Sequence, residues 1–289
     1  MERLLGKKVS ASIRAEAEKL LAELSGYVPT LAIVRVGERG DQIAYERGAE
    51  HRMERFGLKT RKFIFPEDVS EEVFFQAFRE INKNPEIDGI LLLKPLPEQL
   101  STKRAEEEID PEKDLDGISP VNIARVFAGE AAGFAPCTAE AAIETLKTYD
   151  IPIKGRRAVV VGRSLVVGRT LAMLFLKENA TVTICHTQTA QLPEECRKAQ
   201  ILAVAAGRAG LIGADCVSEG CTVIDIGINA RADGSLCGDV DMAAIEDRAA
   251  GVTPVPGGIG AVTTAVLAKH LLVAALRRRQ LLQKTEIRL

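Results

Sequence analysis

A glycine-containing turn in the second half of the chain has the composition of a phosphate-binding loop. Gly162 directly follows the apolar run 158–161, and Arg163, Ser164 and Gly168 lie in the stretch that then opens a helical pattern. A glycine turn between a strand and a helix directs backbone N–H groups and the positive helix end at a phosphate group. The match to G-x-G-x-x-G is incomplete, because Ser164 replaces the second glycine and Gly168 comes one residue late. A tight turn without a ligand explains this segment equally well when it is considered alone.

The end of the next predicted strand indicates which dinucleotide would fit. A site for NAD usually has a carboxylate there, about 20 residues after the glycines, which binds the ribose 2′-hydroxyl. The strand 181–185 is followed instead by His186 and Thr187, without an acid. Arg163 and Thr187 supply a cation and a hydroxyl, which suit a 2′-phosphate and predict NADP. NAD stays possible, because an arginine also binds other phosphate oxygens, and His186 is either part of the site or only the end of the strand.

Short apolar strands alternate with helical patterns, which is typical of βαβ units and parallel sheets. In the first half, strands are expected at residues 30–36, 62–65 and 89–93, with helices at 9–24, 41–56 and 70–82. In the second half, a helix is expected at 139–149, strands at 158–161, 181–185, 201–205, 222–226 and 251–253, and a closing helix at 265–283. The pattern predicts a two-domain α/β protein, in which an N-terminal α/β domain precedes a Rossmann-type, doubly wound parallel sheet.

Composition excludes several classes of protein. The net charge is -2, aromatic residues make up 4% and there is no Trp, so neither a basic surface nor stacking platforms for nucleic acid are expected. The N-terminus mixes charged and apolar residues, unlike a signal peptide, and no apolar run is expected to reach the length of a membrane span. Six cysteines lack zinc-site spacing, so no metal is expected. These features predict a cytoplasmic protein without membrane or nucleic-acid partners.

Several sequence blocks together resemble the methylene-tetrahydrofolate dehydrogenase/cyclohydrolase (FolD) family. In the second half these are GRSLVVG at 162–168, TVTICHTQT at 181–189, VIDIGIN at 223–229, GDVD at 238–241 and TPVPGGIG at 253–260. In the first half, KDLDG at 113–117, PCT at 136–138 and the GIL…PLP frame at 89–97 match. The resemblance covers almost the whole chain in the family's order, and such a set is far more specific than one glycine motif.

This family converts 5,10-methylene-tetrahydrofolate to 5,10-methenyl-tetrahydrofolate, with hydride transfer to NADP or NAD. Its bifunctional members then hydrolyse the methenyl cation to 10-formyl-tetrahydrofolate. The resemblance implies a homodimeric enzyme of one-carbon metabolism, with a folate-binding catalytic domain of residues 1–140 and 265–289, a NAD(P)-binding domain of residues 141–264, and a cleft between them. It also implies that the cofactor contacts Gly162, Arg163, Ser164, Gly168, His186, Thr187 and Ile228.

The resemblance places the catalytic positions in the first half of the chain. On the family's Y-x-x-x-K helix the tyrosine is Tyr45, but Ala49 stands where the lysine belongs. On its GILVQLPLP strand the glutamine falls on Leu93, and the aspartate of its KDVDG block is Asp116. Tyr45 and Asp116 are therefore expected to be the catalytic and substrate-binding residues. Further substrate contacts are expected from Pro256, Gly257 and Gly258.

Tyr45 and Asp116 are present while the lysine and glutamine are absent. This combination predicts that the dehydrogenase reaction is kept and the cyclohydrolase reaction is lost. Hydride transfer moves no proton, so positioning carries most of the work. Asp116 would accept paired hydrogen bonds from the amino-pyrimidine edge of the pterin, and Tyr45 would stack on its ring. Hydrolysis must activate water and move protons, which calls for a positioned acid or base. In the family, the lysine has that role and the glutamine orients it, so we expect a dehydrogenase without cyclohydrolase activity.

Two alternatives stay open. A bifunctional enzyme could use a relocated base, for which His51, Glu50 and Lys94 are candidates, although helix and strand geometry directs each of them away from position 49 or 93. The chain could also be a non-catalytic folate- or nucleotide-binding protein. Four departures from the family's pattern, at Ala139, Ala141, Thr170 and residues 261–262, favour this second alternative.

Overall fold

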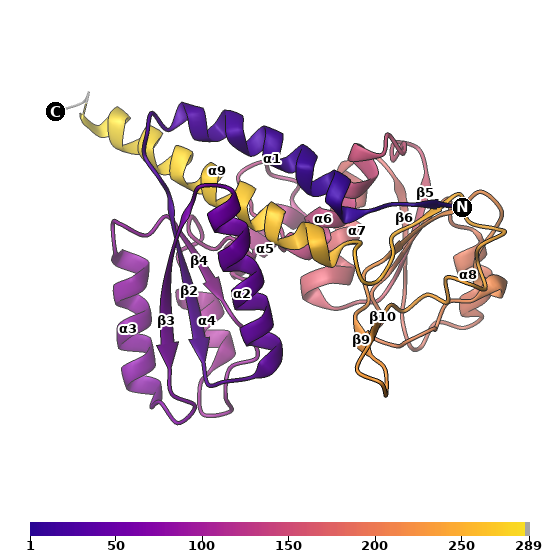
Figure 1. Ribbon diagram of the computed structural model, residues 1–289, viewed down its shortest axis with the longest axis horizontal. Coiled ribbons are helices and arrows are strands. Elements are labelled where there is room, and N and C mark those ends of the chain that lie inside the picture. Colours follow the sequence, from indigo (N-terminus) through magenta and orange to yellow (C-terminus); the bar gives the residue numbers. More distant parts are fainter. Residues whose placement is uncertain (287–289) are drawn as a thin grey trace. The chain divides into compact units, whose positions relative to one another are not determined.

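The computed structural model describes residues 1–286 and the side chains of residues 1–280 (Figure 1). The chain forms two compact units. The six-stranded unit comprises Met1–Ser12, Val126–Ala131 and Pro136–Thr263, and the three-stranded unit comprises Ile13–Arg125, Ala132–Ala135 and the chain from Thr264 onward. Two helices, α1 (Gly6–Glu23) and α9 (Gly260–Glu286), have residues in both units.

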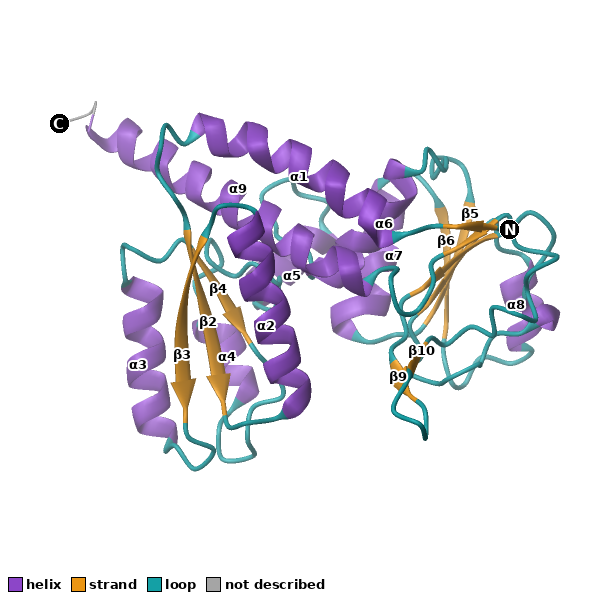
Figure 2. Cartoon of the chain, in the orientation of Figure 1, coloured by secondary structure: helices purple, strands orange, loops and turns teal. Residues whose placement is uncertain are grey.

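The six-stranded unit is built on a parallel sheet with strand order β1-β11-β8-β7-β5-β6. Both faces are covered: α6 and α7 lie on one and α8 on the other (Figure 2), which explains why the central strands β5, β7 and β8 are buried along most of their length. The expected doubly wound α/β fold is confirmed. The strands are β1 (Glu2–Arg3), β5 (Arg157–Val161), β6 (Thr181–Cys185), β7 (Ile201–Val204), β8 (Thr222–Asp225) and β11 (Gly251–Val252). The other elements are α6 (Cys137–Thr148), the π-helical turn η1 (Leu165–Arg169), α7 (Thr170–Lys177), α8 (Leu192–Arg197), the 3₁₀ turn η2 (Ala214–Cys216) and an antiparallel ribbon of β9 (Asn229–Ala230) and β10 (Leu236–Cys237).

The three-stranded unit has a parallel sheet with strand order β3-β2-β4. Its helix α3 packs three buried phenylalanines, at positions 74, 75 and 78, on one face of the sheet, and α2 covers the other face (Figure 1). Ser70 caps α3, because its Oγ accepts a hydrogen bond from the Val73 N–H. The elements are β2 (Thr30–Val36), α2 (Gly40–Arg55), β3 (Lys59–Phe65), α3 (Glu71–Lys83), β4 (Gly89–Leu92), α4 (Thr102–Glu108) and α5 (Pro120–Phe127).

The compact units of the structure divide the chain differently from the expected domains at the N-terminus. Residues 1–12 were expected in the folate-binding domain, but they belong to the six-stranded unit because Glu2 and Arg3 pair with Gly251 and Val252. Residues 126–131 and 136–140 also belong to that unit. A strand of two exposed residues carries no periodicity, so it could not be recognised in the sequence.

The helix α9 corrects the expectation that no apolar run reaches the length of a membrane span. Its segment Gly260–Gln280 has a mean hydropathy of 1.3 and is long enough to cross a membrane, although no such run was expected. This segment is 67% buried inside the protein. A buried core helix passes the same test, so the segment is weak evidence for a membrane span.

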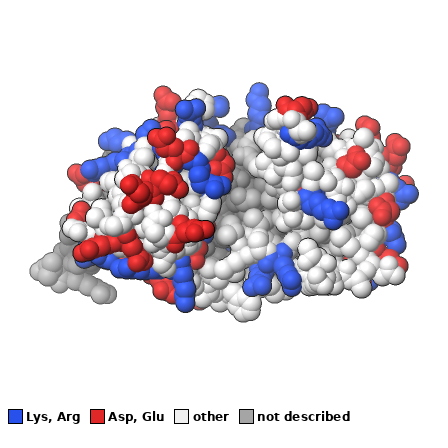
Figure 3. Space-filling model, turned by 90° about the horizontal axis from the view of Figure 1, so that it is seen from below, with Lys and Arg blue, Asp and Glu red and all other residues white. Residues whose placement is uncertain are grey.

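Charged side chains of both signs are exposed on the face shown in Figure 3. On the face in Figure 3, Lys and Arg side chains alternate with Asp and Glu side chains, in keeping with the net charge of -2. Such mixing is typical of a solvated surface.

Candidate active site

The turn after β5 brings backbone segments closer together than any residue except glycine permits. Gly162 has a φ of 133°, and a Cβ added to it would lie 2.3 Å from the Ala205 carbonyl oxygen. A Cβ on Gly168 would lie 2.1 Å from the Gly162 carbonyl oxygen. Both distances are far inside contact range, so the shape of the turn itself requires glycine at these two positions.

A Gly168→Ala substitution is therefore expected to open the turn. The added methyl group must displace the backbone of Gly162, because no flexible side chain is there to move. We expect a loss of about 1–3 kcal/mol in the free energy of unfolding, as for other overpacked sites. Nucleotide affinity should fall by at least ~10-fold because the phosphate loop shifts. Thermal unfolding and cofactor titration would measure the two effects.

Gly213→Ala is the control for this change. Its Cβ would meet only Asp215 Oδ1, at 3.4 Å, in the same unit. Unchanged stability and affinity are expected there, and equal losses in the two variants would contradict the assignment of the tight turn.

Ser164 begins the helical segment that follows the turn. Its Oγ accepts hydrogen bonds from the N–H groups of Val167, at 3.2 Å, and Gly168, at 3.4 Å. The hydroxyl of Thr170, which directly follows the π-helical turn η1, donates to the Leu165 carbonyl oxygen at 2.6 Å. Thr170 stands where the family has proline, and its hydroxyl makes a bond that proline could not make. The departure at position 170 is thus accommodated within the turn.

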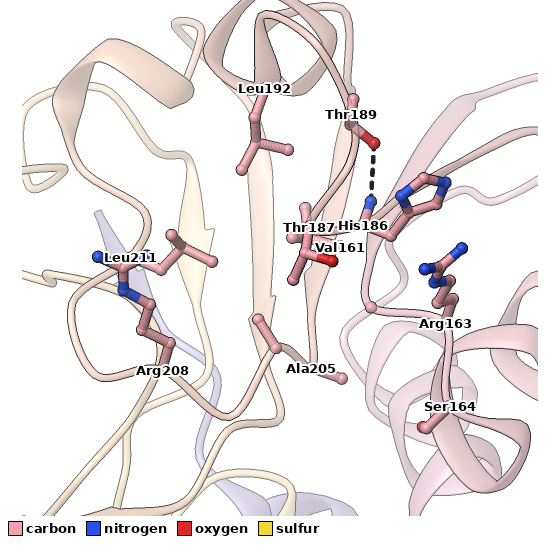
Figure 4. Close-up of a pocket in the computed structure, with 12 residues that line it drawn as sticks. Val161, Arg163, Ser164, His186, Thr187, Thr189, Leu192, Ala205, Arg208 and Leu211 are labelled. Carbon is pink, nitrogen blue, oxygen red and sulfur yellow. Dashed lines mark hydrogen bonds between the residues drawn. The ribbon is translucent and has the colours of Figure 1, made fainter.

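A cavity of about 460 Å³ lies at the carboxyl ends of β5, β6 and β7. Figure 4 shows the side chains of Arg163 and His186 on one side of it and Arg208 on the other, with Thr187 between them. Five predicted residues line the cavity: Gly162, Arg163, Ser164, His186 and Thr187. Sequence reasoning missed Thr189, Leu192, Ala205, Ala206, Arg208 and Leu211, which also line it. The carboxyl ends of neighbouring parallel strands meet at one edge, so the loop after β7 could have been included on that ground.

His186 has a structural role as well as a place in the cavity. Its N–H donates to Thr189 Oγ1 at 2.8 Å (Figure 4), and its ring Nδ1 accepts from the Gln188 N–H at 3.1 Å. The ring therefore closes the turn that follows β6. Both interpretations of His186 are compatible with this geometry, because the ring also borders the cavity.

Two buried carboxylates fix the loop that carries Arg208. The Asp239 carboxylate accepts hydrogen bonds from the N–H groups of Ala206, Gly207 and Arg208, at 2.6–2.9 Å. Asp225 accepts from three further backbone N–H groups, and burial raises the pKa of its carboxyl to about 6. The VIDIGIN and GDVD blocks thus position the far wall of the cavity.

Other predicted residues of this unit lie outside the cavity lining. Ile228 is 60% exposed in the segment after β8, and Gly168 is buried in the helical turn. Gly257 has a φ of 100°, and its carbonyl oxygen accepts from the Gly6 N–H at 2.9 Å. A Cβ on Gly258 would lie 2.5 Å from the Pro254 carbonyl oxygen. Glycine is needed at 257 and 258 for the turn itself, so these residues, with Pro256, form a rigid bend before α9.

The buried thiols form no metal site. All six cysteines are free and buried. Burial raises the pKa of Cys196 far above its usual range and that of Cys221 to about 12. Within residues 1–286, no group of three His, Cys, Asp or Glu side chains could hold a metal ion. These cysteines pack as small apolar residues.

In the three-stranded unit, Ala49 and Leu93 are both buried. Ala49 is 0% exposed on the inner face of α2, together with Gln42, Glu46 and Met53, and Leu93 is 4% exposed directly after β4. The Leu93 N–H donates to the Val34 carbonyl oxygen, which extends the β2–β4 pairing. Tyr45 is half-buried on the same helix. Two apolar side chains thus occupy the positions at which the sequence resemblance predicts a lysine and a glutamine.

Asp116 projects from a loop that its neighbours hold in place. The Asp114 carboxylate accepts from the N–H groups of Ile118, at 3.0 Å, and Ser119, at 2.8 Å. Lys113 donates to two carbonyl oxygens at the end of α3, and burial lowers its pKa to about 8. His270 Nδ1 lies 2.7 Å from the Leu115 carbonyl oxygen, which ties the loop to α9. The KDLDG block therefore combines a structural lysine and aspartate with a half-buried Asp116.

The three candidates for a relocated base are engaged in other contacts. His51 is 69% exposed and 3.8 Å from Glu54. Glu50 pairs with Lys62 at 3.0 Å, and Lys94 pairs with Glu106 at 2.7 Å. The ion pairs direct the Glu50 and Lys94 side chains toward Lys62 and Glu106, and His51 lies on the exposed side of α2.

Comparison with known proteins identifies two matching domains. Residues 4–116 match the catalytic domain of tetrahydrofolate dehydrogenase/cyclohydrolase, and residues 136–279 match the NAD(P)-binding domain of the same family. The second match confirms that the cofactor is a nicotinamide dinucleotide. It also covers the glycine turn and every residue of the cavity described above.

Individual relatives agree with these matches along nearly their full lengths. The Bifunctional protein FolD of Alkaliphilus oremlandii is 47% identical over 267 residues, which cover 92% of this chain and 93% of that protein. The crystal structure of the bifunctional enzyme FolD from Campylobacter jejuni is 33% identical, with a TM-score of 0.92 over 96% of this chain and 99% of the other. The Trypanosoma brucei FolD structure, complexed with NADP cofactor and inhibitor, is 32% identical, with a TM-score of 0.86 over 94% and 95%. The chain belongs to the tetrahydrofolate dehydrogenase/cyclohydrolase family.

Proposed function

We propose that this chain oxidises 5,10-methylene-tetrahydrofolate to 5,10-methenyl-tetrahydrofolate with NADP, and that it does not hydrolyse the product. The observation that carries the proposal is the burial of Ala49 and Leu93, two apolar side chains at the family's lysine and glutamine positions. Neither can donate or accept a proton. Tyr45, Asp116 and the glycine turn are all retained, so the residues for binding and positioning are present without the acid/base pair.

The cavity after β5 fits NADP. Its volume, about 460 Å³, suits part of a dinucleotide, and the Gly162 turn places a helix start beside it. Arg163 borders it with His186 and Thr187, and no carboxylate lines it. The Arg163 guanidinium would attract a 2′-phosphate, and the lining has no acid that would repel it. This lining therefore favours NADP over NAD. When bound, the nicotinamide supplies the hydride acceptor.

The folate would be held by positioning groups alone. Asp116 would accept two hydrogen bonds from the amino-pyrimidine edge of the pterin, and Tyr45 would cover its ring. Neither residue has to move a proton, because hydride transfer turns the methylene bridge directly into the methenyl cation. The cation is the end product in an enzyme without a base to activate water.

An Arg163→Leu substitution should weaken NADP binding selectively. Removing one charge-assisted contact costs about 1.5–3 kcal/mol, which corresponds to a KM for NADP higher by ~10- to 100-fold. The KM for NAD should change less than ~3-fold, since NAD lacks the 2′-phosphate. Steady-state kinetics with each cofactor would measure this. Arg169→Leu removes an exposed arginine outside the cavity lining and is the matched control. A parallel loss with both cofactors would contradict the assigned role.

We further propose that the three-stranded unit binds folate and the six-stranded unit binds NADP in a cytoplasmic homodimer. The assignment rests on Tyr45 and Asp116 in the former and on the cavity in the latter. Light scattering of the purified protein would measure its mass in solution. The mass of a dimer is expected, and the mass of a monomer would contradict this proposal.

The dehydrogenase proposal is tested by following NADP reduction with 5,10-methylene-tetrahydrofolate. Substrate-dependent formation of NADPH would support it. Cofactor binding without any reduction would favour the non-catalytic alternative, for which the departures at Ala139, Ala141 and residues 261–262 are the motivating observation. The same assay with NAD measures the cofactor preference.

A further inference from the structure

A buried ion pair lies beneath the helix that carries Tyr45. Arg35 Nε lies 2.6 Å from Glu46 Oε2, and the two side chains are only 8% and 6% exposed. Arg35 also donates to the Gly37 carbonyl oxygen. Lys62 lies 3.6 Å from Glu46, and it links the pair to the surface. An ion pair this deep is costly to desolvate, and removal of either partner alone would leave an uncompensated buried charge.

The pair lies on the same face of the sheet as Ala49 and Leu93, where the resemblance predicts a lysine and a glutamine. Ala32, Val34 and Val36 of β2 belong to the core beside α3, so alternation turns Arg35 toward α2 (Figure 1). Val34 is paired with Leu92, and the next positions along the two strands are Arg35 and Leu93. On α2, Glu46 and Ala49 both belong to the buried face. The ion pair is thus adjacent to position 93 across the sheet and to position 49 along the helix.

The helix α2 has little stability of its own. Arg39 at its N-cap makes no side-chain capping hydrogen bond, since its guanidinium pairs with Asp41 in the first turn, and the sequence places glycines at 40 and 48. Glycine is among the weakest helix formers, and an uncapped end frays. Glu46 attaches the first half of α2 to β2 through Arg35, and the Nε2 of Gln42 donates to the Pro95 carbonyl oxygen at 2.8 Å. Tyr45 lies between these two attachments.

We propose that Arg35 and Glu46 are positioning residues, which hold Tyr45 in place for the folate by anchoring the first half of α2 to β2. The inference rests on the proposed role of Tyr45. It explains why a charged pair is retained in an apolar layer: an apolar contact could slide along the sheet, whereas a hydrogen-bonded ion pair fixes the helix in one place.

The test replaces both charges together, so that no unpaired charge remains. In an Arg35→Met, Glu46→Leu variant, kcat/KM for 5,10-methylene-tetrahydrofolate should fall by on the order of 10- to 100-fold, as expected for a misplaced contact. The loss should be mainly in KM for the folate, while the KM for NADP changes less than about 2-fold because the cavity is untouched. Hydrogen exchange of the α2 amides should become faster. Glu54→Gln, an 82% exposed carboxylate on the same helix, is the matched control and should leave all of these values unchanged.

A third substitution separates positioning from a direct charge effect. Gly48→Ala adds a methyl group where no heavy atom lies within 4 Å, and it strengthens the helix without restoring any charge. Added to the double variant, it should recover at least several-fold of the lost kcat/KM and slow the α2 exchange again. No loss in the double variant, or a loss with unchanged exchange and no recovery, would overturn the proposal.

This design also separates the inference from the proposed function. A wild-type protein without dehydrogenase activity would contradict the proposed function. In that case folate affinity, measured by titration, would take the place of kcat/KM in the same set of variants. An unchanged folate affinity in the double variant would then overturn the positioning role, while α2 exchange would still report on the anchor.

Discussion

An Asp116→Asn variant is expected to lose at least ~100-fold in kcat/KM for 5,10-methylene-tetrahydrofolate, corresponding to about 3 kcal/mol. The amide would keep one acceptor oxygen but turn an NH₂ group toward a donor on the amino-pyrimidine edge. One hydrogen bond would become a repulsive contact, and the negative charge that strengthens the other would be lost. Steady-state kinetics with saturating NADP would measure the effect. Normal kinetics would remove Asp116 from the substrate site.

Asp114→Asn provides the contrast within the same KDLDG block. Asp114 is 0% exposed and accepts hydrogen bonds from two backbone N–H groups and from Asn122. Its replacement should lower the melting temperature, because a buried network loses its charged acceptor. Asp116→Asn, at a half-buried position, should lower that temperature less. A reversed pattern, with the stability loss at 116, would show that the two carboxylates have exchanged roles.

The second large effect is a gain of activity. A variant with both Ala49→Lys and Leu93→Gln is expected to hydrolyse 5,10-methenyl-tetrahydrofolate at least ~10-fold faster than the wild-type protein, since a positioned acid/base typically contributes 10²–10⁴-fold. Ala49 and Leu93 are adjacent to one charged pair on one sheet face, so a lysine and a glutamine there would share a site. The decay of the methenyl absorbance, corrected for buffer hydrolysis, is the measurement.

The control for this gain of hydrolysis must add a side chain of about the same volume as lysine at position 49. Ala49 is fully buried, so the long lysine stem is itself expected to cost stability. Ala49→Met combined with Leu93→Gln adds a chain of similar length without a titratable group. Hydrolysis should rise only in the lysine variant. No gain with a folded protein would contradict the assignment of positions 49 and 93 to the acid/base pair.

Much of the sheet architecture could be predicted from the sequence. The strand expected at 181–185 is β6 without any change, and Gly162 falls directly after β5 as the phosphate-loop pattern requires. Parallel strands buried on both faces read as short apolar runs with glycine or polar ends, so their limits are visible. The same regularity brought Arg163, His186 and Thr187 to one cavity.

Features that depend on contacts between distant residues could not be predicted. The strand β1 exists only because Glu2 and Arg3 find an open edge at β11, far along the chain. Arg208 reaches the cavity because Asp239, beyond it in the sequence, fixes its loop. Arg35 lies in an otherwise apolar strand, and only the structure reveals that its partner is Glu46 on the next helix. Such pairings carry no periodic signal.

The burial of Ala49 and Leu93 refines the sequence-based expectation about hydrolysis. In the sequence, the absence of lysine and glutamine left open whether another base had moved into their place. The structure has His51, Glu50 and Lys94 engaged with Glu54, Lys62 and Glu106, respectively. The ion pairs of Glu50 and Lys94 are in keeping with the single-reaction enzyme that we propose.

The most direct test of that proposal follows methenyl-tetrahydrofolate during turnover. Purified protein, NADP and 5,10-methylene-tetrahydrofolate would be monitored for NADPH and for the methenyl absorbance in the same reaction. We predict that both rise together, and that the methenyl product then decays only at the rate of the buffer without protein. NADPH formation accompanied by faster decay of the methenyl product would contradict the account, because an acid/base other than the missing lysine would then be at work.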